Sequence, residues 1–250
     1  MLADPDVATK DIAKLISSDA TLTARILQCV NSAGFGIQHS VGNVQHAVTL
    51  MGLDRTREVT LSLATRAYAK GALKTEELRR CWRHSIATAV LAEVIAQACG
   101  AFTDLAFTAG IMHDVGRLGL LLAYPGRYEQ TIRNAAERCL DLLDFERQEF
   151  GFDHAEAGRE LSESWGLPPE FCIVAGRHHD PCEGTELDLL RIVHTACRLA
   201  DALGYDVTRP LIPLEIDAVL AELPPSAVKR LDASAEGLCA RIEQRMREFD

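Results

Sequence analysis

Apolar residues recur at helical spacing along most of the chain, and this periodicity constrains the fold more than any other sequence feature. Residues three and four positions apart share one face of a helix, so a helix that buries one face repeats its apolar residues at that interval. The clearest stripes are Leu22, Ile26, Leu27 and Val30, then Val59 and Leu63, and then Ile86, Val90, Val94 and Ile95. We find no segment with the alternation that a half-buried strand requires. The pattern predicts an all-α fold.

Glycine and proline residues divide this pattern into about a dozen helices. The breaks lie at Gly34 to Gly36, Gly42, Gly52, Gly71, Gly100, Pro125, Gly126, Gly151, Gly166, Pro168, Pro169, Pro181 to Gly184, Pro224 and Pro225. Asp153 followed by Glu156 is typical of a capping box and predicts a helix that runs to Trp165. We expect one unit over residues 1–204, with an N-terminal helical subdomain (1–71) and a core (72–204). Two further helices in the more polar residues 205–250 would pack on that core.

Charge and composition argue against several classes of protein. The net charge is −10 and no cluster of Lys and Arg occurs, which argues against a nucleic-acid surface. The most apolar run, Leu118 to Ala123, is far shorter than the roughly 20 residues of a membrane span. The first residues, MLADPDVATK, lack the layout of a signal peptide. We therefore expect a cytoplasmic protein, without excluding a further upstream domain.

The cysteines are distributed singly, without a C-x-x-C pair: Cys29, Cys81, Cys99, Cys139, Cys172, Cys182, Cys197 and Cys239. This distribution favours reduced thiols in the core over disulfides or a cysteine-based zinc cluster.

The central part of the chain carries seven residues suited to metal ligation: His84, His113, Asp114, His154, His178, His179 and Asp201. His113-Asp114 ends an apolar helix that starts at Leu105, and His178-His179 ends a helix that starts at Pro169. Two ligand pairs at helix ends, with single ligands projecting from rigid helices, suit a centre with two metal ions. A single histidine in any of these positions would more often be an ordinary core or surface residue.

The predicted chemistry follows from the charge of such a centre. Two cations about 3.5–4 Å apart can clamp the attacking and leaving oxygens of a phosphoester. Imidazole-rich ligation with two carboxylates favours iron, manganese, zinc or nickel over magnesium or calcium. We expect Asp114 and Arg117 to be catalytic, and Arg177 and Arg198 to bind phosphate oxygens of the ligand. The alternative for these arginines is a solvated helix-surface position or a contact with the candidate ligand carboxylates from outside the site.

An ordered series of motifs resembles the HDOD family, the "HD-related output domain" of bacterial signalling proteins. The motifs are SSDATLTARILQCVNSAGFG, QHAVTLMGL, CWRHSIATAVLAE, AFTAGIMHDVGRLGLL, FGFDHAEAGRELSESWGLP and AGRHHDP. They extend from about Pro5 to Asp201, and the most specific are NSAGF at Asn31 to Phe35 and HDVGRLGL at His113 to Leu120. The resemblance implies an HD-domain-like helical core in residues 72–204, and it makes residues 1–204 the HDOD domain.

The wider HD superfamily hydrolyses phosphoesters with bound metal, and its HD-GYP branch hydrolyses cyclic di-GMP. The seven ligand-type residues match superfamily positions, with His178 and His179 at the paired histidines of HD-GYP. The chain departs from HD-GYP because DPCEGTELD follows the pair without Gly-Tyr-Pro, and because Arg117 replaces the usual lysine. Arg80 stands where some HD-GYP members have an extra carboxylate ligand, which favours two metal ions over three.

Three functions are consistent with the resemblance. The first is a signalling module whose metal centre binds or hydrolyses a nucleotide or other phosphoester. The second is a regulatory domain with a structural or vestigial metal site, whose output is contact with a kinase, receiver or cyclase. The third is a nucleotide sensor without catalysis. The NSAGF segment is interpreted as a helix end in which Phe35 packs, and the family resemblance makes it a candidate partner surface.

Overall fold

A computed structural model describes residues 9–32, 40–53, 55–56, 59, 75–182, 187–209, 211–231 and 234–247. Every regular element in these residues is a helix, so the predicted all-α class is confirmed. The helices are α1 (Thr9–Ile16), α2 (Ala20–Val30), α3 (Val44–Met51), α5 (Glu76–Cys99), α6 (Ala106–Met112), α7 (Val115–Ala123), α8 (Arg127–Arg138), α9 (Leu142–Phe150), α10 (His154–Ser164), α11 (Pro169–Arg177), α12 (Leu189–Ala202), α13 (Ile216–Leu220), α14 (Pro225–Val228) and α15 (Ala235–Arg247).

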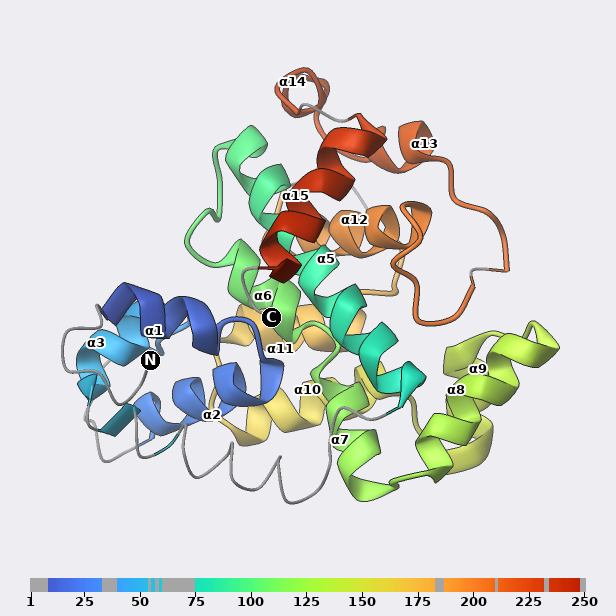
Figure 1. The fold of residues 1–250 in the computed structure, drawn as a ribbon, viewed down its shortest axis with the longest axis horizontal. Helices are drawn as coiled ribbons and strands as arrows, with labels where there is room; N and C mark the ends of the chain where they lie inside the picture. The colour runs from blue at the N-terminus through green and yellow to red at the C-terminus, as the bar shows by residue number, and fades with distance from the viewer. Residues whose placement is uncertain are drawn as a thin grey trace.

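The long helix α5 forms the axis of the molecule, with α6, α12 and α15 packed against it (Figure 1). The side chain of Thr75 accepts a hydrogen bond from the backbone N–H of Leu78 and so caps its first turn. Gly100 ends the helix in the left-handed conformation, with φ of 69°. These two signals set the length of the helix and the position of His84 along it.

Two hydrophobic clusters stabilise the fold. The larger joins the N-terminal helices to α5, α6, α12 and α15, through residues that include Ile12, Leu27, Val48, Ile95, Ile111, Val193 and Ile242. The smaller lies among α7, α8 and α9 and includes Leu120, Tyr128, Leu142 and Phe145. Figure 1 shows α8 and α9 side by side at the end of the molecule away from α1 and α3. The candidate site lies where these two clusters meet.

Two glycines bring the helices around His113-Asp114 unusually close to their neighbours. A Cβ on Gly110 would lie 2.6 Å from the Cα of Ala89 in α5. A Cβ on Gly116 would lie 1.8 Å from the carbonyl oxygen of His154 in α10. Because any side chain would collide with backbone at both positions, glycine is required for α6 to approach α5 and for α7 to approach α10.

Several local predictions are confirmed. Asp153 and Glu156 form the capping box of α10, each side chain bonding the backbone N–H of the other residue. The helices expected before His113 and after Pro169 are α6 and α11. The C-terminal residues differ from expectation because they hold α13, α14 and α15 in place of two helices, since the Pro224-Pro225 pair isolates the single-turn α14.

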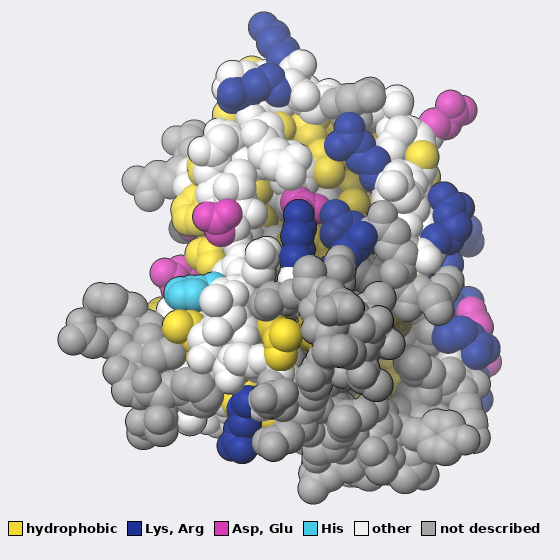
Figure 2. All heavy atoms as spheres, turned by 60° about the vertical axis from the view of Figure 1, so that its left-hand side comes forward, with side chains coloured by type: hydrophobic (Ala, Val, Ile, Leu, Met, Phe, Trp, Pro, Cys, Tyr) yellow, Lys and Arg dark blue, Asp and Glu magenta, His cyan; other side chains and the backbone are white. Residues whose placement is uncertain are grey.

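Other predictions concern parts of the chain outside the described residues. These are the Gly34 and Phe35 portion of NSAGF, the stripe at Leu63 and the boundary at Gly71. Within the described part, no helix is both long and apolar enough to cross a membrane. On the face drawn in Figure 2, the described Lys and Arg side chains lie in several separate spots, some of them beside Asp or Glu side chains.

All eight cysteines are free, which confirms the prediction of unpaired thiols. Their burial is more varied than expected. Cys81, Cys172 and Cys197 are buried, whereas Cys139 is exposed and the others are intermediate.

Candidate metal centre

The carboxylate of Asp114 lies between two sets of imidazoles. Its Oδ1 is 3.3 Å from Nε2 of His154 and 3.3 Å from Nε2 of His178. Its Oδ2 is 3.7 Å from Nε2 of His84 and 3.6 Å from Nε2 of His113. The four rings therefore present the same kind of atom to one carboxylate, two on each side.

Five helices contribute to this convergence. His84 is buried on α5, His113 and Asp114 form the junction between α6 and α7, and His154 is the first residue of α10. His178 and His179 follow the last turn of α11, and Nε2 of His179 lies 2.9 Å from Nε2 of His154. The structure thus brings six of the seven predicted ligands into one cluster, in which five imidazoles lie around the carboxylate of Asp114.

Backbone carbonyls fix the orientation of three of these rings. Nδ1 of His84 donates to the carbonyl of Tyr205 at 3.0 Å, and Nδ1 of His113 donates to that of Gly110 at 2.7 Å. Nδ1 of His178 donates to the carbonyls of Val174 and Ala175. Because a carbonyl oxygen can only accept, Nδ1 carries a proton in each ring, and in the neutral imidazole this leaves the lone pair on Nε2. This is the protonation state that a metal-binding histidine needs.

His154 is oriented by a carboxylate instead. Glu146 of α9 is fully buried; its Oε2 lies 2.6 Å from Nδ1 of His154 and accepts the backbone N–H of the same residue at 2.8 Å. Its Oε1 accepts the hydroxyl of Tyr128 at 2.6 Å. Sequence reasoning missed both residues. The available signal for Glu146 was its place on the apolar face of α9, four residues after Leu142 and next to Phe145.

Arg117 is buried and donates from Nε to Oδ2 of Asp114 at 2.7 Å. Its Nη1 lies 3.5 Å from the hydroxyl of Tyr128 and 3.9 Å from Glu146. Burial alone would raise the pKa of Asp114, but Arg117 and His113 hold that pKa well below its usual range. The carboxylate is therefore ionised at neutral pH and available to a cation.

The imidazoles differ in the direction in which their surroundings shift the pKa. Burial lowers the pKa of His113 and of His178, so both rings are neutral at neutral pH. Burial and Arg117 act to lower the pKa of His154 as well, but Glu146 and Asp114 outweigh them and raise it. Burial also raises the pKa of the Cys197 thiol well above its usual range.

Unsatisfied polar atoms at the centre indicate that a cation fits there. Oδ1 of Asp114 and Nε2 of His178 are buried and have no hydrogen-bond partner among the described residues. Nε2 of His84 also faces Nε2 of His113 at 3.2 Å, although both atoms carry lone pairs. Buried acceptors without donors are costly, and a metal ion between Oδ1 of Asp114 and Nε2 of His178 would satisfy both atoms. A second ion between His84 and His113 would bind the two facing nitrogens.

The ligand atoms form two groups that could each hold an ion. Asp114, His154, His178 and His179 form one group, and His84, His113 and Cys197 form the other. Within each group the ligand atoms lie within 4.8 Å of one another. Asp114 adjoins both groups through its two oxygens.

The other predicted site residues lie at the edge of the centre or away from it. Asp201 of α12 faces Nδ1 of His84 at 3.4 Å, behind the ring. Arg177 is exposed and pairs with Asp180 at 3.1 Å, and Arg198 pairs with Glu222. Both arginines thus engage carboxylates that do not belong to the predicted ligand set.

A cavity of about 150 Å³ leads to the metal centre. Its wall includes His84, Arg117, His154, His179 and Asp201. The rest of its lining is Leu140 to Leu143, Val207, Thr208, Arg209 and Leu211, of which the exposed Leu140, Arg209 and Leu211 mark its outer rim. Arg209, which sequence reasoning did not select, provides an exposed positive charge at this rim.

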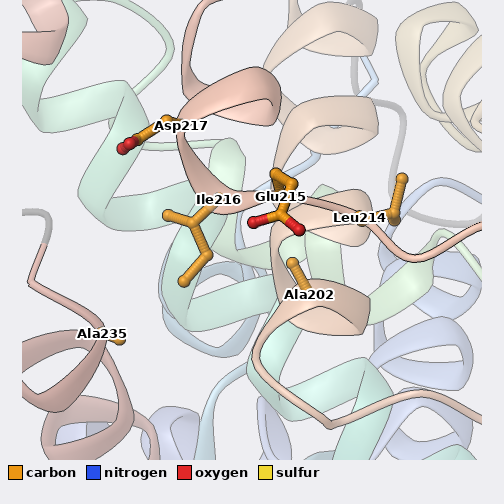
Figure 3. Close-up of a pocket in the computed structure, with 6 residues that line it drawn as sticks. All are labelled: Ala202, Leu214, Glu215, Ile216, Asp217 and Ala235. Carbon is orange, nitrogen blue, oxygen red and sulfur yellow. The ribbon is translucent and has the colours of Figure 1, made fainter.

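A second cavity, of about 370 Å³, lies between α12, α13 and the start of α15. Figure 3 shows that the carboxylates of Glu215 and Asp217 on its wall do not converge on a common point. Apart from these two carboxylates its lining is Ala202, Leu214, Ile216 and Ala235, so the ligand cluster described above is the better candidate site.

Comparison with known proteins places this centre in context. A protein from Treponema pallidum (strain Nichols), itself described as uncharacterized, is 28% identical over 183 residues, which are 72% of this chain and 35% of that relative. The chain therefore spans about a third of that relative's length. The crystal structure of the MmoQ response regulator from Methylococcus capsulatus str. Bath is 30% identical, with a TM-score of 0.73, over 93% of this chain and 92% of that one.

The crystal structure of an HDOD domain protein of unknown function from Geobacter sulfurreducens is 25% identical, with a TM-score of 0.54, over 99% of this chain and 86% of that one. The family model of the HDOD domain matches residues 1–181, which is most of the chain. The chain therefore belongs to the HDOD family.

Proposed function

We propose that this chain is a signal-transduction module whose His/Asp centre holds two divalent transition-metal ions and binds a phosphoester. One observation carries the proposal: the ionised carboxylate of Asp114 lies between two sets of inward-facing imidazole nitrogens, with Oδ1 buried and unpartnered. Imidazole-rich sets with a single shared carboxylate suit iron, manganese, zinc or nickel. When bound, such ions act as Lewis acids that polarise a phosphoryl oxygen.

The residues of the chain have distinct parts in this function. His154, His178 and His179 with Asp114 would hold one ion, and His84 and His113 with Asp114 the other. Arg117 positions the Asp114 carboxylate through its Nε and adds positive charge to the cavity wall. Glu146 keeps the proton of His154 on Nδ1, directed away from the centre.

The size of the cavity limits which ligands can fit inside it. At about 150 Å³ it is smaller than the roughly 300–1,000 Å³ of typical drug-sized ligand pockets. It can enclose a phosphate group, while a nucleoside or other organic portion would lie at the rim beside Arg209 and the exposed Leu140 and Leu211. We therefore expect preference for a terminal phosphoester over an enclosed cyclic dinucleotide.

Two measurements test this function. Protein purified without chelator is expected to contain stoichiometric transition metal by elemental analysis. It is then assayed against a panel of phosphomonoesters and of linear and cyclic nucleotides. The double variant His113→Ala with Asp114→Ala should lose both metal and phosphoester binding. Absence of transition metal in protein grown with iron, manganese, zinc and nickel would refute the proposal.

The second candidate function is a regulatory domain whose metal centre is structural or vestigial. The burial of His113, Asp114 and His178 favours it, because closed, fully protein-ligated sites are typical of structural metals. In this case output would come from contact with a kinase, receiver or cyclase. The same double variant would then lose metal while its effect on a partner's activity stayed unchanged.

The proposal also concerns the extent of the domain and its location. Cys197 and Asp201 lie on α12, beyond the residues matched by the family model, and α12 packs on α5. This supports an HDOD domain over residues 1–204, covered by the helices of residues 205–250. The free cysteines support a cytoplasmic location, where thiols stay reduced.

A further inference from the structure

We infer that Cys197 is a thiolate ligand of one metal ion, so that the centre consists of two unlike halves. One half is the His84, His113 and Cys197 group with Oδ2 of Asp114. The other is the His154, His178 and His179 group with Oδ1 of Asp114. This inference rests on the proposed metal centre and specifies its chemistry.

The separations of the ligand atoms carry the argument. Atoms bound to one zinc-type ion in a tetrahedron, at about 2.0–2.1 Å for nitrogen or oxygen and about 2.3 Å for sulfur, lie about 3.3–3.6 Å from one another. Nε2 of His84 lies 3.5 Å from Sγ of Cys197, 3.2 Å from Nε2 of His113 and 3.7 Å from Oδ2 of Asp114. Nε2 of His113 lies 3.6 Å from the same oxygen. Two of these four edges of a tetrahedron fall within that range, and the other two lie about 0.1 Å outside it.

Oδ2 of Asp114 can accept a hydrogen bond from Arg117 and bind a metal ion at the same time. That oxygen accepts the Nε–H of Arg117, and a carboxylate oxygen has a second lone pair for a metal ion. Arg117 also compensates part of the negative charge that a thiolate adds to the buried site. The charge balance of this half is thus set by one arginine, one carboxylate and one sulfur.

Helix α12 offers two candidates for this position, and the geometry selects the sulfur. Asp201, one turn after Cys197, faces Nδ1 of His84, the atom that already donates to the carbonyl of Tyr205. Cys197 faces Nε2 of the same ring, the atom with the lone pair. A soft thiolate favours zinc or ferrous iron, whereas the half with three imidazoles and a carboxylate accepts manganese or nickel as well.

Substitution with Co²⁺ tests the inference directly. Metal-free full-length protein is titrated with Co²⁺ alone and its absorption spectrum recorded. A bound thiolate gives an intense sulfur-to-cobalt charge-transfer band in the near ultraviolet, which imidazole and carboxylate ligands do not produce. We expect this band in the wild type, in Asp201→Asn and in the control Cys172→Ala, whose cysteine is buried in α11. In Cys197→Ala the charge-transfer band should disappear, and the protein should bind half as much cobalt as the wild type.

Cys197→Ser serves as a conservative second variant, because its hydroxyl replaces the thiol with little change in volume. We expect Cys197→Ser to keep the helical circular dichroism of the wild type and also to lack the charge-transfer band. Cobalt binding without a charge-transfer band in the wild type, or a band that persists in Cys197→Ser, would overturn this inference and leave the proposed function standing. A wild-type protein that binds no Co²⁺ at all would contradict the proposed metal centre itself.

Discussion

Glu146 holds His154 at two points: its Oε2 lies 2.6 Å from the ring Nδ1 and accepts the backbone N–H of the same residue at 2.8 Å. The contact links α9, in the smaller hydrophobic cluster, to the first residue of α10. It fixes both the ring plane and the position of its proton. The orientation of one candidate metal ligand therefore depends on a carboxylate that contacts no other candidate ligand.

The first prediction concerns this pair. Glu146→Gln replaces the carboxylate with a neutral amide, which is a weaker acceptor for the Nδ1 proton. Loss of such an outer partner typically costs about 10–100-fold in metal affinity. We expect that loss for Zn²⁺, measured by competition with a chromogenic chelator.

Glu149→Gln is the matched control for this measurement, because Glu149 lies on the same helix, at the surface, and pairs with Arg127. Its Zn²⁺ affinity should equal that of the wild type. Equal affinities for all three proteins would show that Glu146 does not position His154 for metal.

The second prediction concerns the buried ion pair of Asp114 with Arg117. Asp114→Asn deprives the buried guanidinium of the carboxylate that it contacts at 2.7 Å and leaves only Glu146, at 3.9 Å. Removal of one member of a buried pair costs about 3–5 kcal/mol. We expect a loss of this size in the free energy of unfolding of the chelator-treated protein, determined by urea denaturation.

Two companion variants separate the cost of the unpaired buried charge from a general loss of stability caused by substitution. Adding Arg117→Met to Asp114→Asn removes the unpaired charge and should restore much of the stability. Glu76→Gln removes an exposed pair with Arg79 and should cost about 0–1 kcal/mol. If the double variant were less stable than Asp114→Asn alone, the charge argument would be wrong.

Much of the fold could be predicted from the sequence because its determinants are local. Helical spacing of apolar residues, the Asp153 capping box and the breaks at Gly100 and Pro169 all act within one or two turns. The C-terminal helices were predicted less well. Leu231, Leu238 and Ile242 bury their side chains in the large core, a tertiary contact that periodicity alone does not reveal.

The candidate site was predicted in its ligand types and less well in their surroundings. The His113-Asp114 and His178-His179 pairs stand out because they end helices. Glu146, Tyr128 and Cys197 do not, since each residue type is common on a buried helix face and their convergence depends on packing between distant segments. For the same reason the sequence could not reveal that Arg177 and Arg198 engage Asp180 and Glu222.

The third prediction is a pH dependence of the metal-free protein. Burial raises the pKa of Asp201 to about 6, above its ordinary value near 4. As the pH rises through this interval, the unfolded chain loses its proton before the folded chain does, so the folded state loses stability. Asp201→Asn lacks this cost and should become more stable than the wild type by about 1–3 kcal/mol at pH 7.

This stability difference should be small at about pH 4.5 and grow as the pH rises to 7, because the cost is complete only above the folded pKa. Urea denaturation with a chelator present, at a series of pH values, measures it. A stability difference that does not change with pH would show that folding does not raise the pKa of Asp201.

The fourth prediction concerns the close approach of α7 to α10. A Cβ at Gly116 would lie 1.8 Å from the carbonyl oxygen of His154 and 2.6 Å from the backbone nitrogen of Gly158, so neither neighbour can yield without moving a helix. Gly116→Ala should therefore destabilise the fold by at least about 3 kcal/mol, the upper end of overpacking costs. The gain in helix propensity, about 1 kcal/mol, offsets only part of this.

Gly119→Ala is the control within the same helix, because its Cβ would meet only Cδ1 of Leu161, the end of a flexible side chain. It should cost about 1 kcal/mol or less after the same gain in propensity. Thermal unfolding and Zn²⁺ affinity measured on both variants separate packing from ligation: Gly116→Ala should lose both stability and affinity, since α7 positions Asp114 and α10 positions His154. Wild-type values for Gly116→Ala would mean that the two helices do not approach this closely, and Asp114 would then not be held between the two sets of imidazoles.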